Sequence, residues 1–281
     1  MTQTPIPLAG VLQPPDTVSP VTGIFDHWLR VMDLPGRFVP MNVAVEDLGE
    51  VIAMLPKAGF TGLNVARAFQ HLVLDHCDII TDRAALMSGA NTIIFRRDGR
   101  IHADNTDGYG FVENLRQNAP GWNPKSGPAA IFGAGRAARE VVAAMLEIGV
   151  EEIRIANRTR PRAEALRAEF GARISVVDWV KAGNILDGAT TVVNATPLGT
   201  PGYAEFRVPL DALRPGSVVS DLAISPGLTR LLRLAIDNHC YAVDGIGMAL
   251  YQAAPSFERW YGQRPVVDQA ARAAVVSAYS E

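Results

Sequence analysis

The stretch AAIFGAGRAAREVVAAMLEIGVEEIRIANRTRPR, residues 129–162, decides the fold of this chain. It opens with the apolar run Ala129–Phe132, and Gly133, Gly135 and Ala138 then match the pattern G-x-G-x-x-G/A. In that pattern the first glycine permits a tight turn and the second lets the backbone approach a pyrophosphate. The third small residue lets a helix lie close to the strand. The stretch therefore predicts a strand, a turn and a helix that bind a dinucleotide.

A second strand is expected at Glu152–Ala156, after a helix of apolar residues at helical spacing that Gly149 ends. Arg158 follows this strand, where an NAD enzyme usually carries an acidic residue for the ribose 2′-hydroxyl. A guanidinium suits a 2′-phosphate instead, because its planar fork donates two hydrogen bonds to phosphate oxygens. The sequence therefore predicts NADP as the cofactor. The residues predicted to bind it from this stretch are Gly133, Ala134, Gly135, Arg136, Ala137, Asn157, Arg158, Thr159 and Arg162. Arg136 has two readings, a contact with phosphate at the helix start or a side chain that faces water.

Composition excludes several classes of partner. The 281 residues have a formal net charge of −3, which gives no basic footprint for nucleic acid or an anionic membrane. No apolar run is long enough to span a bilayer, and the first residues lack the basic start and apolar core of a signal peptide. Only two cysteines occur, so we expect buried or free thiols in a reducing cytoplasm. His71, His76 and Cys77 lack the spacing of a zinc motif, so no metal site is predicted.

The first third of the chain alternates strand and helix patterns. This alternation predicts an α/β domain with a largely parallel sheet. A helix is expected at Pro20–Met32, with Ser19 able to cap it, and a hairpin is expected around Asp98-Gly99. The segment from Met248 to Ser280 is expected to be mostly helical and to pack on the first domain. Other expected elements are strands at 8–12, 37–43 and 59–64, a helix at 46–55, and later strands at 174–177, 191–194 and 217–221.

Several short motifs follow one another in one order along the chain. They are Thr17-Val18-Ser19-Pro20, Asn64-Val65, Ala90-Asn91-Thr92, Asp104-Asn105-Thr106-Asp107-Gly108, Gly133-Ala134-Gly135, Asn157-Arg158-Thr159, Asn194-Ala195-Thr196, Asp244-Gly245-Ile246-Gly247-Met248 and Gln252-Ala253-Ala254. This series resembles the shikimate dehydrogenase family over nearly the whole chain. Each motif alone is weak, but the whole set in register is specific.

The resemblance implies two α/β domains. A substrate-binding domain would comprise residues 1–106 with 245–281, and a Rossmann-type NADP domain would comprise 107–244. It also implies hydride transfer between nicotinamide and a cyclic hydroxy or keto acid such as shikimate or quinate, a step of aromatic amino acid biosynthesis, in a monomer or homodimer. Thr17 and Ser19 would hold the substrate carboxylate, and Asp107 would be half of an acid–base pair. Further residues implied are Asn64, Asn91 and Gln252 for the ring hydroxyls, and Ala195, Thr196 and Gly245 for the cofactor.

The chain departs from the family pattern where the catalytic lysine is expected, because Gln70 stands there. An amide cannot exchange a proton in the working pH range, so Asp107 is the titratable group that remains, and activity on shikimate itself is expected to be weak. Asp16 and His71 are alternative bases. Three further departures are Ala66 for threonine, Ala68 for proline and Ile224 for tyrosine.

Two functions therefore stay open. One is an NADP-dependent oxidoreductase that acts on a cyclic hydroxy acid. The other is a catalytically impaired paralogue that binds nucleotide and metabolite as a sensor. More modest roles also remain for single residues: Asn91, Asn105 and Asn194 suit turns and caps, and Asp107 suits the start of a helix.

Overall fold

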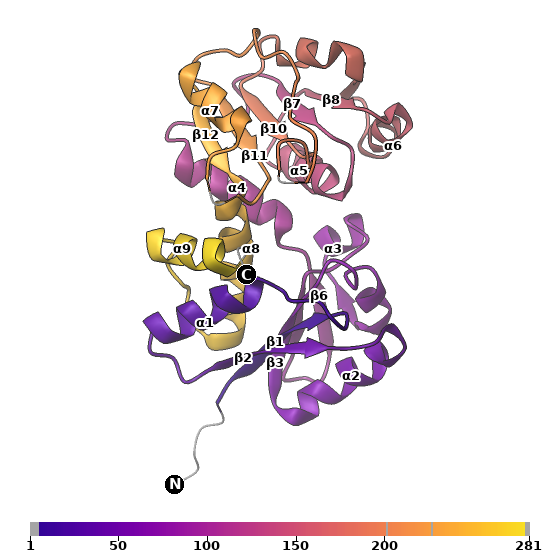
Figure 1. Ribbon diagram of the computed structural model, residues 1–281. Coiled ribbons are helices and arrows are strands. Elements are labelled where there is room, and N and C mark those ends of the chain that lie inside the picture. Colours follow the sequence, from indigo (N-terminus) through magenta and orange to yellow (C-terminus); the bar gives the residue numbers. More distant parts are fainter. Residues whose placement is uncertain (1–5, 201, 226, 279–281) are drawn as a thin grey trace. The chain divides into compact units, whose positions relative to one another are not determined.

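The computed structural model describes residues 6–200, 202–225 and 227–278 (Figure 1). The chain divides into two compact units, and it passes from one to the other twice. The first unit is Met1–Asp107 with Leu250–Glu281, and the second is Gly108–Ala249. The expected domain boundaries, after residues 106 and 244, lie one and five residues before these divisions.

The first unit contains a six-stranded sheet in the order β2-β1-β3-β5-β6-β4. The strands β1, β2 and β3 pair in parallel, whereas β5 is antiparallel to both β3 and β6. The sheet is therefore mixed rather than largely parallel, because the short connection through Asp98-Gly99 folds β5 and β6 into a hairpin. The bounds are β1 Leu8–Gln13, β2 Arg37–Asn42, β3 Phe60–Val65, β4 Ile79–Ile80, β5 Thr92–Phe95 and β6 Ile101–Asp104.

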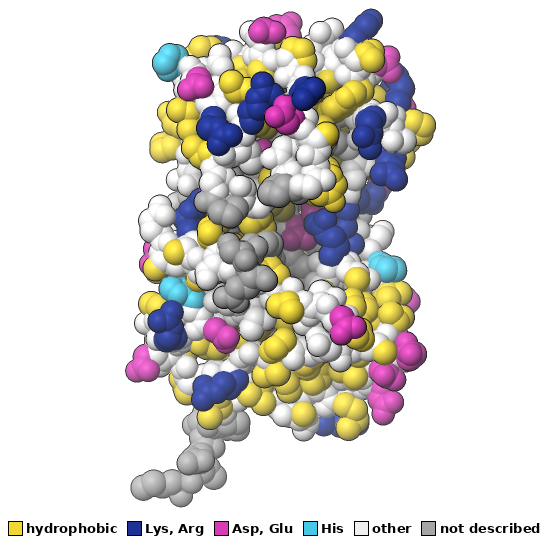
Figure 2. Space-filling view, in the orientation of Figure 1, with side chains coloured by type: hydrophobic (Ala, Val, Ile, Leu, Met, Phe, Trp, Pro, Cys, Tyr) yellow, Lys and Arg dark blue, Asp and Glu magenta, His cyan; other side chains and the backbone are white. Residues whose placement is uncertain are grey.

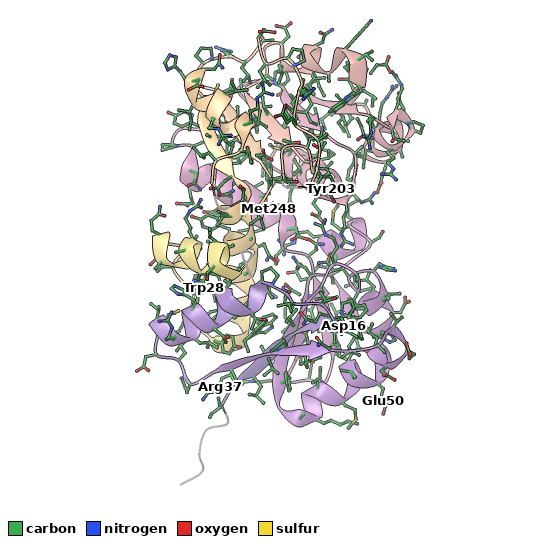
Figure 3. All side chains as sticks on the ribbon, viewed as in Figure 1. Asp16, Trp28, Arg37, Glu50, Tyr203 and Met248 are labelled. Carbon is green, nitrogen blue, oxygen red and sulfur yellow. The ribbon has the colours of Figure 1, made fainter. Side chains whose placement is uncertain are left out.

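The helices of this unit bury an aromatic cluster against its sheet. Phe25 of α1 stacks on Phe38 of β2 with ring centroids 4.2 Å apart. The ring centroid of Phe257 of α8 lies 5.4 Å from that of Trp28, which Figure 3 labels. The C-terminal helices thus pack on the first unit as predicted, although the expected end at Ser280 lies outside the described residues. The bounds are α1 Val21–Val31, α2 Leu48–Met54, α3 Asp82–Leu86, α8 Gly245–Tyr261 and α9 Gln269–Ala278, with short 3₁₀ turns at Val45–Asp47, Leu55–Ala58 and Leu72–His76.

The prediction that Ser19 caps α1 is wrong. The helix begins at Val21 with Pro20 in the N-cap position, and no side chain caps it. Ser19 lies just before the N-cap residue, and its backbone N–H donates to Oε1 of Gln13 at 3.0 Å. Its own carbonyl accepts from the N–H of Thr22. The Ser19 hydroxyl is therefore not used by the helix.

The second unit is a doubly wound sheet in the order β12-β11-β10-β7-β8-β9, and all its pairs are parallel. The order reverses between β7 and β10, and in such sheets ligands bind beyond the carboxyl ends of the strands at this point. The bounds are β7 Ala129–Phe132, β8 Ile153–Asn157, β9 Ile174–Asp178, β10 Thr191–Asn194, β11 Val218–Asp221 and β12 Tyr241–Asp244.

Two hydrophobic cores lie on opposite faces of this sheet because successive strand side chains alternate in direction. On β7, Ala129 and Ile131 join the core under α4, α5 and α6, whereas Ala130 and Phe132 join the core under α7. The predicted strand and helix of the glycine turn are confirmed. The helix bounds are α4 Asp107–Asn118, α5 Arg136–Glu147, α6 Arg160–Phe170 and α7 Arg230–Asp237, with 3₁₀ turns over Trp179–Leu186. In the described ranges, no helix is both long and apolar enough to cross a bilayer.

Candidate functional site

The glycine turn between β7 and α5 has the conformation that the sequence requires. Gly133 has φ +113, and a Cβ there would lie 2.9 Å from the carbonyl oxygen of Ala195. Gly135 has φ −90, and a Cβ there would meet no atom within 4 Å, so open space lies beside the turn. Ala138 is completely buried where α5 approaches the sheet. The first glycine is thus needed for the fold, and the second leaves room for a ligand.

A pocket of about 960 Å³ opens beside this turn, within the second unit. Three segments that the sequence assigned to the cofactor meet in its wall: the turn after β7, the loop after β8 and the loop after β10. Of the predicted residues, those lining the pocket are Gly133, Ala134, Gly135, Asn157, Arg158, Thr159, Arg162, Ala195 and Thr196.

Three predicted residues lie outside that lining. They are Arg136, Ala137 and Gly245. Arg136 pairs with the buried carboxylate of Glu140, with Nε 3.1 Å from Oε1. Gly245 begins α8, where a Cβ would lie 2.4 Å from the carbonyl oxygen of Leu222. Tight packing therefore accounts for glycine at this position.

The arginines after β8 have different surroundings. Arg160 lies 2.9 Å from a carboxylate oxygen of Glu164 and 2.5 Å from one of Asp178. Arg158 and Arg162 are exposed, line the pocket, and form no ion pair with any other described residue. Of the arginines after β8, Arg158 and Arg162 are therefore the ones whose charge no described carboxylate neutralises. Both were predicted to bind the cofactor.

A buried network supports the loop after β10. Asn194 accepts hydrogen bonds from the N–H and hydroxyl of Thr196, and its amide donates to Oδ1 of Asp221 at 3.0 Å. The other oxygen of Asp221 accepts from the hydroxyl of Thr229, the N-cap of α7, at 2.7 Å. Burial raises the pKa of Asp221 above its ordinary value. Asn194 thus has the turn role that its residue type suggested, and it shapes the pocket wall.

In the first unit, Asn91 is the hub of a polar cluster. Its amide nitrogen donates to Oδ1 of Asp107 at 3.0 Å and to Oε1 of Gln252 at 3.1 Å. Its oxygen accepts from the hydroxyl of Thr92 and from both the N–H and the hydroxyl of Thr106. Asn91 is 2% exposed. The cluster thus fixes the carboxylate of Asp107 next to the side chain of Gln252.

Two further residues complete this cluster. Asn64 donates from its amide to the carbonyl oxygen of Asn91 at 3.2 Å. Asn105 accepts the N–H of Asp107 and donates to the carbonyl oxygen of Gly89, so it acts as a turn residue. The structure therefore brings Asn64, Asn91, Asp107 and Gln252 into one group.

Gln70 lies at the position of the expected catalytic lysine and is buried. Its amide nitrogen donates to the carbonyl oxygen of Val65 at 3.1 Å. Its Oε1 is buried and accepts no hydrogen bond from a described residue. The side chain can therefore accept one further hydrogen bond, but it cannot take up a proton. Asp16 and His71, the alternative bases, are both exposed.

Gln13, at the end of β1, is a residue that the sequence reading missed. It is 3% exposed, its amide donates to the carbonyl oxygen of Thr17 and to Oδ1 of Asn42, and it accepts the N–H of Ser19. It thereby sets the shape of the loop that presents Thr17 and Ser19. A polar residue at the carboxyl end of a buried strand was the available signal.

Comparisons with known proteins agree over almost the whole chain. The model for the shikimate dehydrogenase substrate binding domain matches residues 16–93, and the model for shikimate / quinate 5-dehydrogenase matches residues 116–244. A protein of Cereibacter sphaeroides named shikimate dehydrogenase (NADP(+)) is 57% identical over 274 residues, which cover 98% of each chain.

Solved structures show the same fold. The shikimate 5-dehydrogenase of Thermus thermophilus, in complex with NADP(H) and shikimate, aligns with a TM-score of 0.80 at 29% identity, over 97% of this chain and 99% of that one. The 5-ketofructose reductase of Gluconobacter sp. strain CHM43 aligns with a TM-score of 0.83 at 26% identity, over 98% of each chain. This chain belongs to the shikimate dehydrogenase family.

Proposed function

We propose that the protein is an NADP-dependent oxidoreductase that transfers a hydride between nicotinamide and the ring of shikimate or a related cyclic hydroxy acid. The observation that carries the proposal is the pair of unneutralised guanidiniums, Arg158 and Arg162, in a pocket beside the glycine turn. The relatives named NADP(+)-dependent shikimate dehydrogenases support the cofactor and the substrate class.

The second unit would hold the cofactor, which supplies or accepts the hydride. The space beside Gly135 suits the approach of a pyrophosphate to the backbone. Arg158 and Arg162 suit a 2′-phosphate, because each can donate two charge-assisted hydrogen bonds. Trp179 and Tyr203 line the same pocket and would offer apolar surface to the base.

The first unit would hold the substrate. Thr17 and Ser19 would donate hydroxyls to its carboxylate, from a loop that Gln13 holds in shape. Asn64, Asn91 and Gln252 would hydrogen-bond its hydroxyls.

Asp107 would move the proton. Oxidation of an alcohol to a ketone releases a hydride and a proton, so a group beside the reacting hydroxyl must accept the proton. Asn91 holds one oxygen of Asp107 and therefore fixes its direction. Gln70 would contribute a hydrogen bond but no proton, so shikimate would react more slowly than with a lysine there.

The sensor alternative finds no support in the comparisons, since the curated relatives that match nearly the full chain are named as enzymes. The cytoplasmic location and the monomeric or dimeric state expected from the sequence stay predictions.

The proposal is tested by NADPH formation at 340 nm with shikimate, quinate and other cyclic hydroxy acids, using two variants. Asp107→Asn should lower turnover roughly 10²–10⁴-fold and leave NADP binding unchanged, because it removes only the proton acceptor. Arg158→Ala should remove most of a roughly 10–100-fold preference for NADP over NAD. No turnover of any cyclic acid, or full turnover by Asp107→Asn, would contradict the assignment.

A further inference from the structure

The pocket of the second unit contains a third free cation that the sequence motifs do not include. Four cationic residues line it: Arg158, Arg162, Lys181 and Arg207. Arg207 pairs with Glu205, with Nε 3.2 Å from a carboxylate oxygen. Lys181, like Arg158 and Arg162, forms no ion pair or hydrogen bond through its side chain with any other described residue. Three positive charges without an ion-pair partner among the described residues therefore line one pocket, which the carboxylate of Asp211 also lines.

Sheet register brings Lys181 and the arginines to the same edge of the sheet, although they follow different strands. β8 and β9 pair in parallel, with Asn157 opposite Asp178. The chain therefore leaves the sheet at neighbouring points, one residue before Arg158 and three residues before Lys181. The ion pair of Arg160 with Asp178 ties the two connections together. In Figure 2 basic side chains gather over the side of this unit that carries α6.

Like charges repel, so an anion bound among these side chains would lower their mutual repulsion. A multiply charged anion would balance more of this charge than a singly charged one. A phosphate monoester carries about −1.5 to −2 near pH 7, whereas a ribose hydroxyl carries none. The chain has only three lysines, and this is the one in the pocket.

We infer that Lys181 completes a three-cation clamp with Arg158 and Arg162 for the 2′-phosphate of the cofactor, and that it is a determinant of NADP specificity. The inference rests on the proposed use of NADP. Lys181 acts as a point charge from the β9 side, while the two arginines supply directed hydrogen bonds from the β8 side.

The test is isothermal titration calorimetry of NADP and NAD with the full-length protein and three variants. Lys181→Gln removes the charge, Lys181→Arg retains it, and Lys125→Gln removes one lysine charge from an exposed site outside the pocket. Lys181 is exposed, so its substitution leaves the buried cores intact, and melting curves verify this.

Lys181→Gln should raise the Kd for NADP about 5–20-fold and change the Kd for NAD less than about 2-fold, since an exposed charge is partly screened. Lys181→Arg should retain most of the affinity, and Lys125→Gln should match the unmodified protein. The effect of Lys181→Gln should shrink at high salt.

The outcomes that overturn each proposal are distinguishable. If the unmodified protein binds NADP and NAD equally, both the proposed cofactor preference and the clamp are overturned. If it prefers NADP and Lys181→Gln keeps that preference in full, the clamp alone is overturned. A Lys181→Gln variant that loses NADP and NAD affinity equally would mean that Lys181 contacts a part common to both, which also overturns the inference.

Discussion

At the scale of single residues, Gln70 is the position where the proposed chemistry departs most from the family pattern. Its Oε1 is buried without a partner among the described residues, and its amide nitrogen is bound to the backbone of Val65. Such a group is an unused acceptor rather than a proton carrier. Asp107, by contrast, is held by Asn91 and keeps a carboxylate in the polar cluster.

We predict that Gln70→Lys raises shikimate-dependent NADPH formation, because an amine restores an acid–base group worth roughly 10²–10⁴ in rate. The gain should be partial, since hydroxyls are still missing at Ala66 and Ile224. Adding Ala66→Thr and Ile224→Tyr should recover more. Gln117→Lys, on the exposed face of α4, is the control for added charge. Turnover of shikimate by the unmodified protein at about 1–10³ per second would show that Gln70 does not lower the rate, which would contradict this prediction.

The two thiols should be unreactive in the folded protein. Burial, together with nearby Asp78, raises the pKa of Cys77 from 9.0 to about 12, and burial also raises the pKa of Cys240. A raised thiol pKa means less thiolate, by roughly 10³-fold for Cys77 at pH 8. Ellman's reagent should therefore label the Cys240→Ser variant slowly at pH 8 and rapidly after unfolding. Fast labelling of that folded variant would show that Cys77 is accessible and ionised.

At the scale of elements, the sequence pattern predicted most strands and helices to within a few residues. Alternating or continuous apolar runs bounded by glycine were sufficient for β7, α5 and β8. The mixed sheet of the first unit was not predicted, because the strand direction depends on pairing partners rather than on local pattern. The prediction that Ser19 caps α1 was wrong for a similar reason: the side chain that holds Ser19 belongs to Gln13 of β1.

Substitutions at the two glycines of the β7–α5 turn should have different effects, one on stability and the other on NADP binding. Gly133→Ala should lower the free energy of unfolding by about 1–3 kcal/mol or more, because its φ of +113 disfavours a side chain and the Cβ would contact Ala195. Gly135→Ala should fold normally but bind NADP weakly, because its Cβ would enter the open space beside the turn. Thermal melting and calorimetry of both variants measure this. Unimpaired NADP binding by Gly135→Ala would place the pyrophosphate elsewhere.

At the scale of the whole molecule, each unit has its own core and its own group of site residues. The chain passes between the units after residues 107 and 249. The pocket beside the glycine turn belongs to the second unit alone, and the Asn91 cluster belongs to the first alone. NADP should therefore stabilise mainly the second unit, and the substrate should stabilise mainly the first.

Hydrogen exchange should reveal this division. NADP alone should slow amide exchange at residues 133–137, 157–162 and 195–198, because a ligand stabilises the region that binds it. Shikimate alone should slow exchange at 13–19 and 91–107. A reversed pattern, or protection by NADP only in the first unit, would contradict the assignment of the two sites.

The sequence by itself determined the family, the glycine turn and the cofactor class, and it predicted which residues form the two sites. Those features depend on local spacing and residue type. Only the tertiary structure decided which charges are free, because Arg160 is neutralised by Asp178 from a neighbouring strand, whereas Arg158 and Lys181 pair with no described residue.

The same holds for the polar cluster around Asn91. Asn91 and Gln252 are 161 residues apart in sequence and 3.1 Å apart in the structure. Residues that are far apart in the sequence form hydrogen bonds only once strands and helices have packed together. No local sequence pattern therefore encodes such bonds. The sequence motifs included Asn64, Asn91, Asp107 and Gln252. Only the packing of the elements that carry them decided which of them form hydrogen bonds with one another.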